Sequence, residues 1–135
     1  MKKITTLLLS LLLFSCSESK TEIENLTLNN GEKWEKNIET TNGISEMQTL
    51  ISGFNRQSLE DHHNLNSELK REFKKIIRAC NMEGDAHDQL HHYIKPILLD
   101  YFKKIDSKNI ESSKNGLEEL KIHLNEYKNY FKNEK

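Results

Sequence analysis

The stretch Cys80–Pro96, with the sequence CNMEGDAHDQLHHYIKP, decides how the second half of the chain folds. The pair Gly84-Asp85 interrupts it, and aspartate is a frequent N-cap of α-helices. A helix is therefore predicted from Ala86 to about Ile105. Pro96 falls inside that helix, where it removes one backbone hydrogen bond and is expected to kink the helix rather than end it.

Two of the three histidines in this stretch share one face of the predicted helix. His87 and His91 are four residues apart, a spacing that places one side chain above the other. The same face continues through five apolar residues, Leu90, Ile94, Leu98, Tyr101 and Ile105. We therefore expect His87 and His91 to point into the protein and His92 to be solvated.

Three further segments show the apolar period of amphipathic helices. A first helix is predicted after a cap at Thr41 or Asn42, a second ends near Cys80, and a last follows a polar turn over residues 106–113. Their apolar faces are Ile44, Met47, Leu50, Ile51 and Phe54, then Leu65, Leu69, Phe73, Ile76 and Cys80, then Leu117, Leu120, Leu124, Tyr127 and Phe131. Four such helices with short connectors predict an all-α fold, an antiparallel four-helix bundle.

A short segment before the helices has the alternating pattern of a hairpin. Leu26–Trp34 contains apolar and polar residues on either side of Asn29-Asn30-Gly31, residues that tolerate a tight turn. Two strands alone are marginally stable, so the segment should lie on the bundle with Trp34 as its anchor. An extended leader across the bundle is the alternative.

The N-terminus has the features of an exported protein. The basic start Met1-Lys2-Lys3 precedes the apolar run Ile4–Phe14, which is too short to span a bilayer. The run ends in Leu13-Phe14-Ser15-Cys16, which resembles the lipobox of bacterial lipoproteins. That resemblance implies removal of residues 1–15 and lipid attachment to Cys16. An ordinary secretory signal is the alternative.

The lipobox resemblance also implies an address and a domain organisation. Because Ser17 rather than aspartate follows the cysteine, it implies the outer membrane of a Gram-negative cell, with the domain facing the periplasm or the surface. Residues 16–25 are polar and are interpreted as a tether, and residues 26–135 as one helical domain. The segment from Leu26 to Pro96 also resembles small uncharacterised exported lipoproteins that share its Trp-containing leader and its Cys/Met/Gly/His connector.

The charge balance argues against a nucleic-acid-binding protein, and the cysteine content argues against a fold held together by disulfides. The chain carries 20 Lys and Arg against 21 Asp and Glu, and this balance gives no electrostatic case for binding nucleic acid, which requires a basic patch. Cys16 and Cys80 are the two cysteines, and lipid on Cys16 would leave Cys80 without a disulfide partner. The sequence therefore predicts membrane attachment through lipid and does not identify a protein partner.

In an antiparallel bundle, five potential metal ligands should gather at one end: Met47, Cys80, Met82, His87 and His91. Thiolate, thioether and imidazole are the ligands that Cu(I) prefers and that Zn(II) accepts. Haem is a further candidate, without the C-x-x-C-H motif of covalent attachment. His62 lies eighteen residues before Cys80, roughly 27 Å along the helix, so it is expected outside the cluster. The pair His62-His63 is interpreted as a solvated pair or a helix N-terminal feature, and the alternative for His62 is a place on the first turns of the apolar face, with Leu59.

The alternative to a metal site is that these residues belong to the core. Buried Cys and Met often serve as small or adaptable apolar side chains. The chain would then be a non-catalytic structural or protein-interaction lipoprotein, with a polar interaction surface elsewhere. Cys80 and His87 suggest a nucleophile and a base, but no third residue to orient them is evident, so no catalytic activity is predicted.

Overall fold

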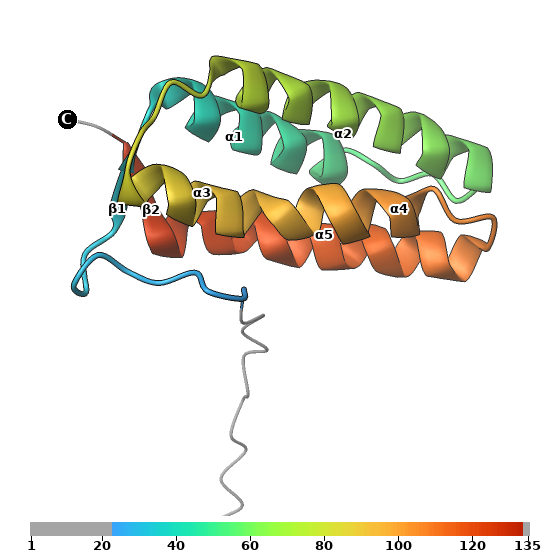
Figure 1. Cartoon of the computed structure of the whole chain (residues 1–135). Helices are drawn as coiled ribbons and strands as arrows, with labels where there is room; N and C mark the ends of the chain where they lie inside the picture. Colours follow the sequence, from blue (N-terminus) through green and yellow to red (C-terminus); the bar gives the residue numbers. More distant parts are fainter. Residues whose placement is uncertain (1–22, 134–135) are drawn as a thin grey trace, which may run out of the picture.

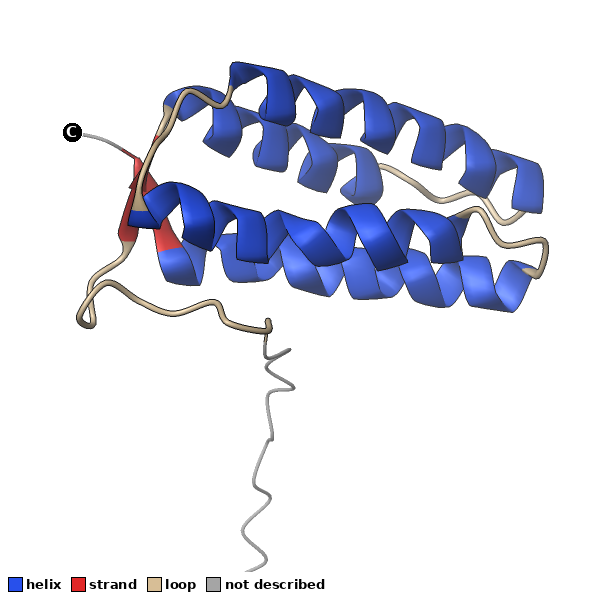
Figure 2. Ribbon diagram, viewed as in Figure 1, coloured by secondary structure: helices blue, strands red, loops and turns tan. Residues whose placement is uncertain are grey.

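The computed structural model describes residues 23–133, which form an antiparallel four-helix bundle with a small two-stranded sheet at one end (Figures 1 and 2). The predicted all-α fold is confirmed. In chain order the elements are β1 (Trp34–Lys36), α1 (Ile38–Ser52), α2 (Leu59–Ala79), α3 (Asp85–Pro96), the π-helical turn η1 (Ile97–Tyr101), α4 (Phe102–Ile105), α5 (Ile110–Tyr130) and β2 (Phe131–Asn133). The predicted signal peptide, Cys16 and the tether residues before Ile23 lie outside the described residues.

Side-chain caps set the starts of three helices. The Asn37 side chain accepts the backbone N–H of Thr40 at 3.1 Å, so α1 begins at Ile38 rather than after Thr41 or Asn42 as predicted. Ser58 and Asn109 cap α2 and α5 in the same way. No helix in the described part of the chain is long and apolar enough to cross a bilayer.

The start of α3 differs from the other three. Gly84 precedes it with a φ of +71°, a conformation that glycine adopts at little cost, and the helix begins at Asp85 instead of Ala86.

Beyond Pro96 the third helix continues, as predicted, but with a change of period. α3, η1 and α4 form one rod, in which the N–H of Phe102 bonds to the carbonyl of Ile97, five residues back. This π-helical spacing shifts the apolar face by one residue. Seven residues of the rod are buried, and Leu98, a predicted core position, is 58% exposed: the buried residues are Leu90, Tyr93, Ile94, Ile97, Tyr101, Phe102 and Ile105.

Two glycines allow the rods to pack closely. A Cβ atom on Gly43 of α1 would lie 2.3 Å from Cγ1 of Ile76 in α2. A Cβ atom on Gly116 of α5 would lie 2.6 Å from Cβ of Lys104 in α4. Along its length α2 lies against α1, and it meets the third rod mainly at α4, so the side between α2 and α3 is left open.

The N-terminal segment combines features of both predicted arrangements. A single antiparallel bridge joins Asn29 to Glu32 around a turn in which Asn30 and Gly31 have positive φ. The strand that follows does not close a hairpin, because β1 pairs in parallel with β2 at the C-terminus, with Trp34 opposite Phe131 (Figure 2).

The leader is nevertheless fixed to the bundle. The indole N–H of Trp34 donates to the carbonyl of Thr27 at 2.6 Å. Ile23, which the sequence assigns to the tether, and Leu26 are both buried in the core.

A buried histidine joins the third rod to α5. The Nε2–H of His123 donates to the carbonyl of Tyr93 at 2.7 Å, since a carbonyl only accepts, and Nδ1 lies 3.4 Å from the hydroxyl of Tyr101. The Tyr93 hydroxyl donates back to the carbonyl of His123 at 3.2 Å. Burial lowers the pKa of His123, so the ring is held neutral in the core.

Candidate functional site

The connector between α2 and α3 brings together two of the predicted ligands. Cys80 ends α2 and His87 lies in the first turn of α3, and the Cys80 Sγ is 3.5 Å from His87 Nδ1. The rings of His87 and His91 are 4.3 Å apart between centroids. Cys80 and His87 are half-buried, so this pair is open to solvent on one side.

The predicted orientations of His91 and His92 are wrong. His91 is exposed and His92 is half-buried, the reverse of the expected pattern. The prediction used a regular helix through Leu98, which rotated the expected apolar face toward His87 and His91. In the structure the inward face of α3 is centred on Leu90 and Tyr93.

Met47 does not join this cluster. It is fully buried in the apolar core. Because α1 begins at Ile38, Met47 lies ten residues from the Asn37 cap, roughly 15 Å along the helix axis. The cap itself is at the Cys80 end, where the Asn37 amide donates to the carbonyl of Ala79 at 3.1 Å. The expected gathering of Met47 with Cys80 is therefore corrected.

The cluster contains a buried lysine that the sequence analysis missed. Lys36 of β1 is 0% exposed, and its Nζ donates to the carbonyl of Ala86 at 2.8 Å. The same atom lies 3.4 Å from Met82 Sδ and 4.6 Å from the ring centre of Phe131. Burial lowers the pKa of Lys36 to about 8, and the negative charge of Cys80 partly opposes that shift.

Lys36 changes the chemistry that the cluster offers. The ammonium lies against the sulfur of Met82, the position in which a bound metal cation would be expected. Among residues 23–133, no group of three or more His, Cys, Asp or Glu side chains is arranged to hold a metal ion. What the structure brings together is a thiol, an imidazole and a buried amine, with Met82 contacting the amine.

The alternation of β1 is the one sequence signal that pointed to Lys36. Successive residues of a strand face opposite sides, so Lys36 lies on the same side as Trp34, the expected anchor of the segment. Because lysine is rarely buried, the alternation alone does not predict that Lys36 enters the core.

A second candidate site lies between α2 and the third rod, and we call it the α2–α3 groove. It has a volume of about 650 Å³ and continues into a hollow of about 610 Å³ beside α4. Ile77, Leu98 and Leu99 line it with exposures of 46%, 58% and 54%. They are three of the six exposed large hydrophobic residues in the described part of the chain.

The rim of the α2–α3 groove is basic. Five cationic residues line the groove and its continuation: Lys70, Lys74, Arg78, Lys95 and Lys103. The acidic residue of the lining, Asp106, forms an ion pair with Lys70. The exposed His91 and the half-buried His92 complete the rim at the Cys80 end. An apolar floor with a cationic rim is the opposite of the polar surface expected for an interaction protein.

No family model matches the chain, and comparison with curated proteins and with solved structures gives no significant match.

Proposed function

We propose that the chain is a lipid-anchored, non-catalytic binding protein of the bacterial envelope, and that the α2–α3 groove holds an acidic amphipathic helix of a partner protein. The observation that carries this proposal is the concentration of Ile77, Leu98 and Leu99 in one basic-rimmed groove. Scattered exposed apolar residues are normal, but a contiguous apolar patch rimmed by polar groups is typical of an interaction site.

The size and shape of the groove favour a helix. Along the third rod its lining extends from His91 to Asp106, fifteen residues or roughly 22 Å. That length accommodates about four turns of an α-helix. An amphipathic helix places apolar residues every three or four positions into such a groove, which is one of the recurring modes of peptide recognition.

The charge of the rim favours an acidic partner. Lys74 and Arg78 of α2 lie across the groove from Lys95 of α3. A helix lying between them would present Glu or Asp on both flanks to these cations, whereas a basic helix would be repelled.

Two synthetic peptides of equal length test the groove directly. Both carry leucines at helical spacing, and their flanks carry glutamate in one and lysine in the other. We expect the glutamate peptide to bind and the lysine peptide not to bind. Leu98→Ser should weaken binding roughly tenfold, about 1.4 kcal/mol, because it removes one apolar contact. Ile122→Ser is the matched control, since Ile122 is 37% exposed on α5 outside the groove.

Three results would contradict the proposal. Equal binding of the two peptides would remove the role of charge. Equal losses in Leu98→Ser and Ile122→Ser would remove the role of the groove. Binding of anionic lipid vesicles, with neither peptide bound, would make the groove a lipid site.

The membrane anchor is proposed from the lipobox and has its own test. Wild-type chain should fractionate with the outer membrane and carry acyl groups on Cys16. Cys16→Ala should release the chain or leave its signal peptide uncleaved. A soluble, unacylated wild-type chain would contradict the anchor without affecting the groove.

A second candidate function is Cu(I) binding by Cys80 and His87, and the 3.5 Å contact between them favours it. Cu(I) is a soft ion that thiolate and imidazole bind well, and Met82 would supply a third ligand only if the ammonium of Lys36 moved away. Zn(II) normally requires four ligands, so it should bind more weakly.

The experiment uses the reduced chain with Cys16→Ser, so that lipid and the second thiol are absent. Cu(I) should bind at one equivalent and raise the midpoint of thermal unfolding, because a ligand of the folded state stabilises it. His87→Ala should abolish the shift and His92→Ala should preserve it. Absence of a shift with Cu(I) in the parent chain would refute this candidate.

A further inference from the structure

The end of the bundle opposite to Cys80 contains a small polar hollow, which we call the distal hollow. It has a volume of about 240 Å³ and lies between the α1–α2 loop and α5. Its lining includes Phe54, Arg56, His62, Lys114, Glu118 and Lys121. None of them belongs to the Cys80 cluster or to the α2–α3 groove.

His62 is the central observation. It lies in the first turn of α2 and is 2% exposed, which agrees with a place on the apolar face of that helix and not with a solvated pair. One side of the ring packs edge-on against Phe54, with ring centres 4.9 Å apart. Nδ1 is buried and has no hydrogen-bond partner among the described residues. A buried polar atom without a partner is costly, so such atoms in native proteins generally meet water or a ligand.

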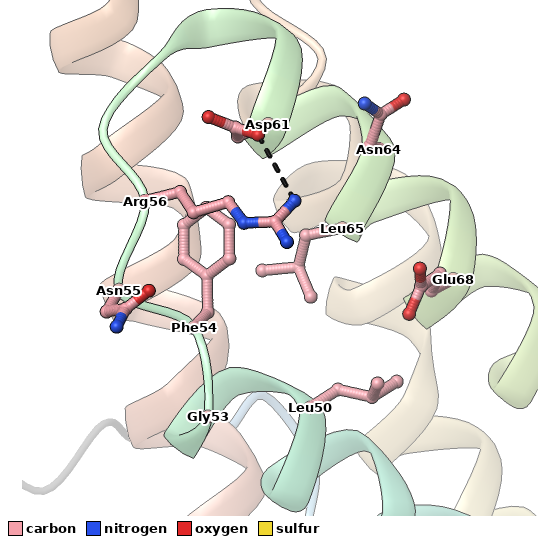
Figure 3. A pocket seen from close by; sticks show the side chains of 9 residues that line it. All are labelled: Leu50, Gly53, Phe54, Asn55, Arg56, Asp61, Asn64, Leu65 and Glu68. Carbon is pink, nitrogen blue, oxygen red and sulfur yellow. Dashed lines mark hydrogen bonds and ion pairs between the residues drawn. The ribbon is translucent and has the colours of Figure 1, made fainter.

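The hollow has an excess of positive charge. Arg56 reaches across a neighbouring pocket, which shares Phe54 with the distal hollow, and pairs with Asp61 at 3.4 Å (Figure 3). Lys121 lies 3.6 Å from Glu118. Lys114 has no ion-pair partner within residues 23–133.

Lys114 also acts on the histidine. Burial and then the positive charge of Lys114 lower the pKa of His62, and both residues line the distal hollow. A negative group between the two would be attracted to the ammonium and would meet the polar edge of the imidazole.

We propose that the distal hollow binds a small oxyanion, a phosphate or a carboxylate, with Lys114 and Lys121 supplying the charge and the ring of His62 a hydrogen bond. The volume suits an ion of this size and not a large ligand. The start of α2, at Leu59, adds the partial positive charge of a helix N-terminus to the same region. This site is independent of the groove and of its partner.

The test follows the imidazole signals of the full unlipidated chain by NMR at constant neutral pH and ionic strength. Potassium phosphate, acetate and chloride are the three probes. The signal of His62 should shift saturably with phosphate, acetate or both, and not with chloride. His63 is the internal control, because its Nε2 lies 3.0 Å from the carbonyl of Ser107 and it does not line the hollow.

Two variants locate the response. Lys114→Gln should raise the dissociation constant roughly tenfold or more, the loss of one charge-assisted hydrogen bond, and Lys121→Gln should act in the same direction. Lys128→Gln, an exposed change near the other end of α5, should leave the response intact.

The two oxyanions distinguish the ligand class. Saturation by phosphate alone assigns the site to phosphate groups, and saturation by acetate alone assigns it to carboxylates. The proposal is overturned if His62 does not respond to either ion, if His63 shifts equally, or if Lys114→Gln responds like the parent chain.

Discussion

Replacing Lys36 with methionine tests how the buried ammonium affects the stability of the bundle. Lys36 is fully buried at the sheet end of the molecule, where its Nζ meets the carbonyl of Ala86 and the sulfur of Met82. Methionine has a similar length and no charge. Lys36→Met should therefore fill the same space and remove the cost of burying a cation.

The sign and size follow from the pKa of Lys36, which burial lowers from 10.5 to about 8. Between these values the unfolded chain binds a proton that the folded chain has released, so the free energy of unfolding rises with pH. Each pKa unit corresponds to about 1.36 kcal/mol, which gives a rise of about 3 kcal/mol across the window. Below pH 8 the whole penalty is present, and Lys36→Met should there have its largest advantage over the wild type.

Urea unfolding followed by circular dichroism, at steps from pH 7 to pH 10, measures the difference between the two chains. Burial raises the pKa of Tyr93, so ionisation of this tyrosine in the unfolded state destabilises the fold of both chains at high pH. Subtracting the free energies of unfolding of the two chains removes this common effect. The advantage of Lys36→Met should shrink by about 2–3 kcal/mol from pH 8 to pH 10.

A third chain sharpens the test. Cys80→Ser removes the negative charge that raises the pKa of Lys36, so in that variant the rise should begin at a lower pH. A difference between wild type and Lys36→Met that stays constant from pH 7 to pH 10 would refute the reasoning.

Three further outcomes are expected from urea unfolding. Gly116→Ala should destabilise the chain, because its Cβ would lie 3.0 Å from the backbone N of Ile105. This close contact should outweigh the helix propensity of alanine, which is about 1 kcal/mol better than that of glycine. Asn115→Ala, exposed on the same helix, should not destabilise the chain. Stability should fall as pH drops below 6.5, because the unfolded chain then binds a proton that buried His123 excludes, and an unchanged midpoint from pH 7 to pH 5 would contradict this. Leu124→Ala should cost about 2–5 kcal/mol, and a loss under 1 kcal/mol would show that this fully buried position is not tightly packed.

The four helices could be predicted because their apolar period is a local property of the sequence. The seam Leu117, Leu120, Leu124 and Tyr127 is buried as expected. The start of α1 could not be read in this way. Ile38 is 52% exposed, so the first turn of α1 adds nothing to the apolar face, and only the cap at Asn37 marks it.

The sheet end of the molecule was beyond sequence reasoning for a different reason. β1 and β2 are three residues each and pair across nearly the whole described chain. No short-range pattern specifies such a parallel pair. The contact of Cys80 with His87 was predictable, because a short connector joins their helices, but burial of Lys36 depends on the pairing of β1 with the C-terminus.

The exposure of Leu98 connects the error in the predicted helix face with the proposed binding surface. An i, i+4 series runs from Leu90 through Ile94 to Leu98, but at 3.6 residues per turn Leu98 already lies about 80° around the helix from Leu90. The π-turn after Pro96 returns Phe102 to the core face, as its N–H bond to Ile97 and its 4% exposure record. Leu98 is then left at the edge of the rod, facing α2 across the groove. Apolar side chains that stay exposed in the groove lower the solubility of the chain and add nothing to its core. Their concentration at one place therefore favours a binding partner that covers them.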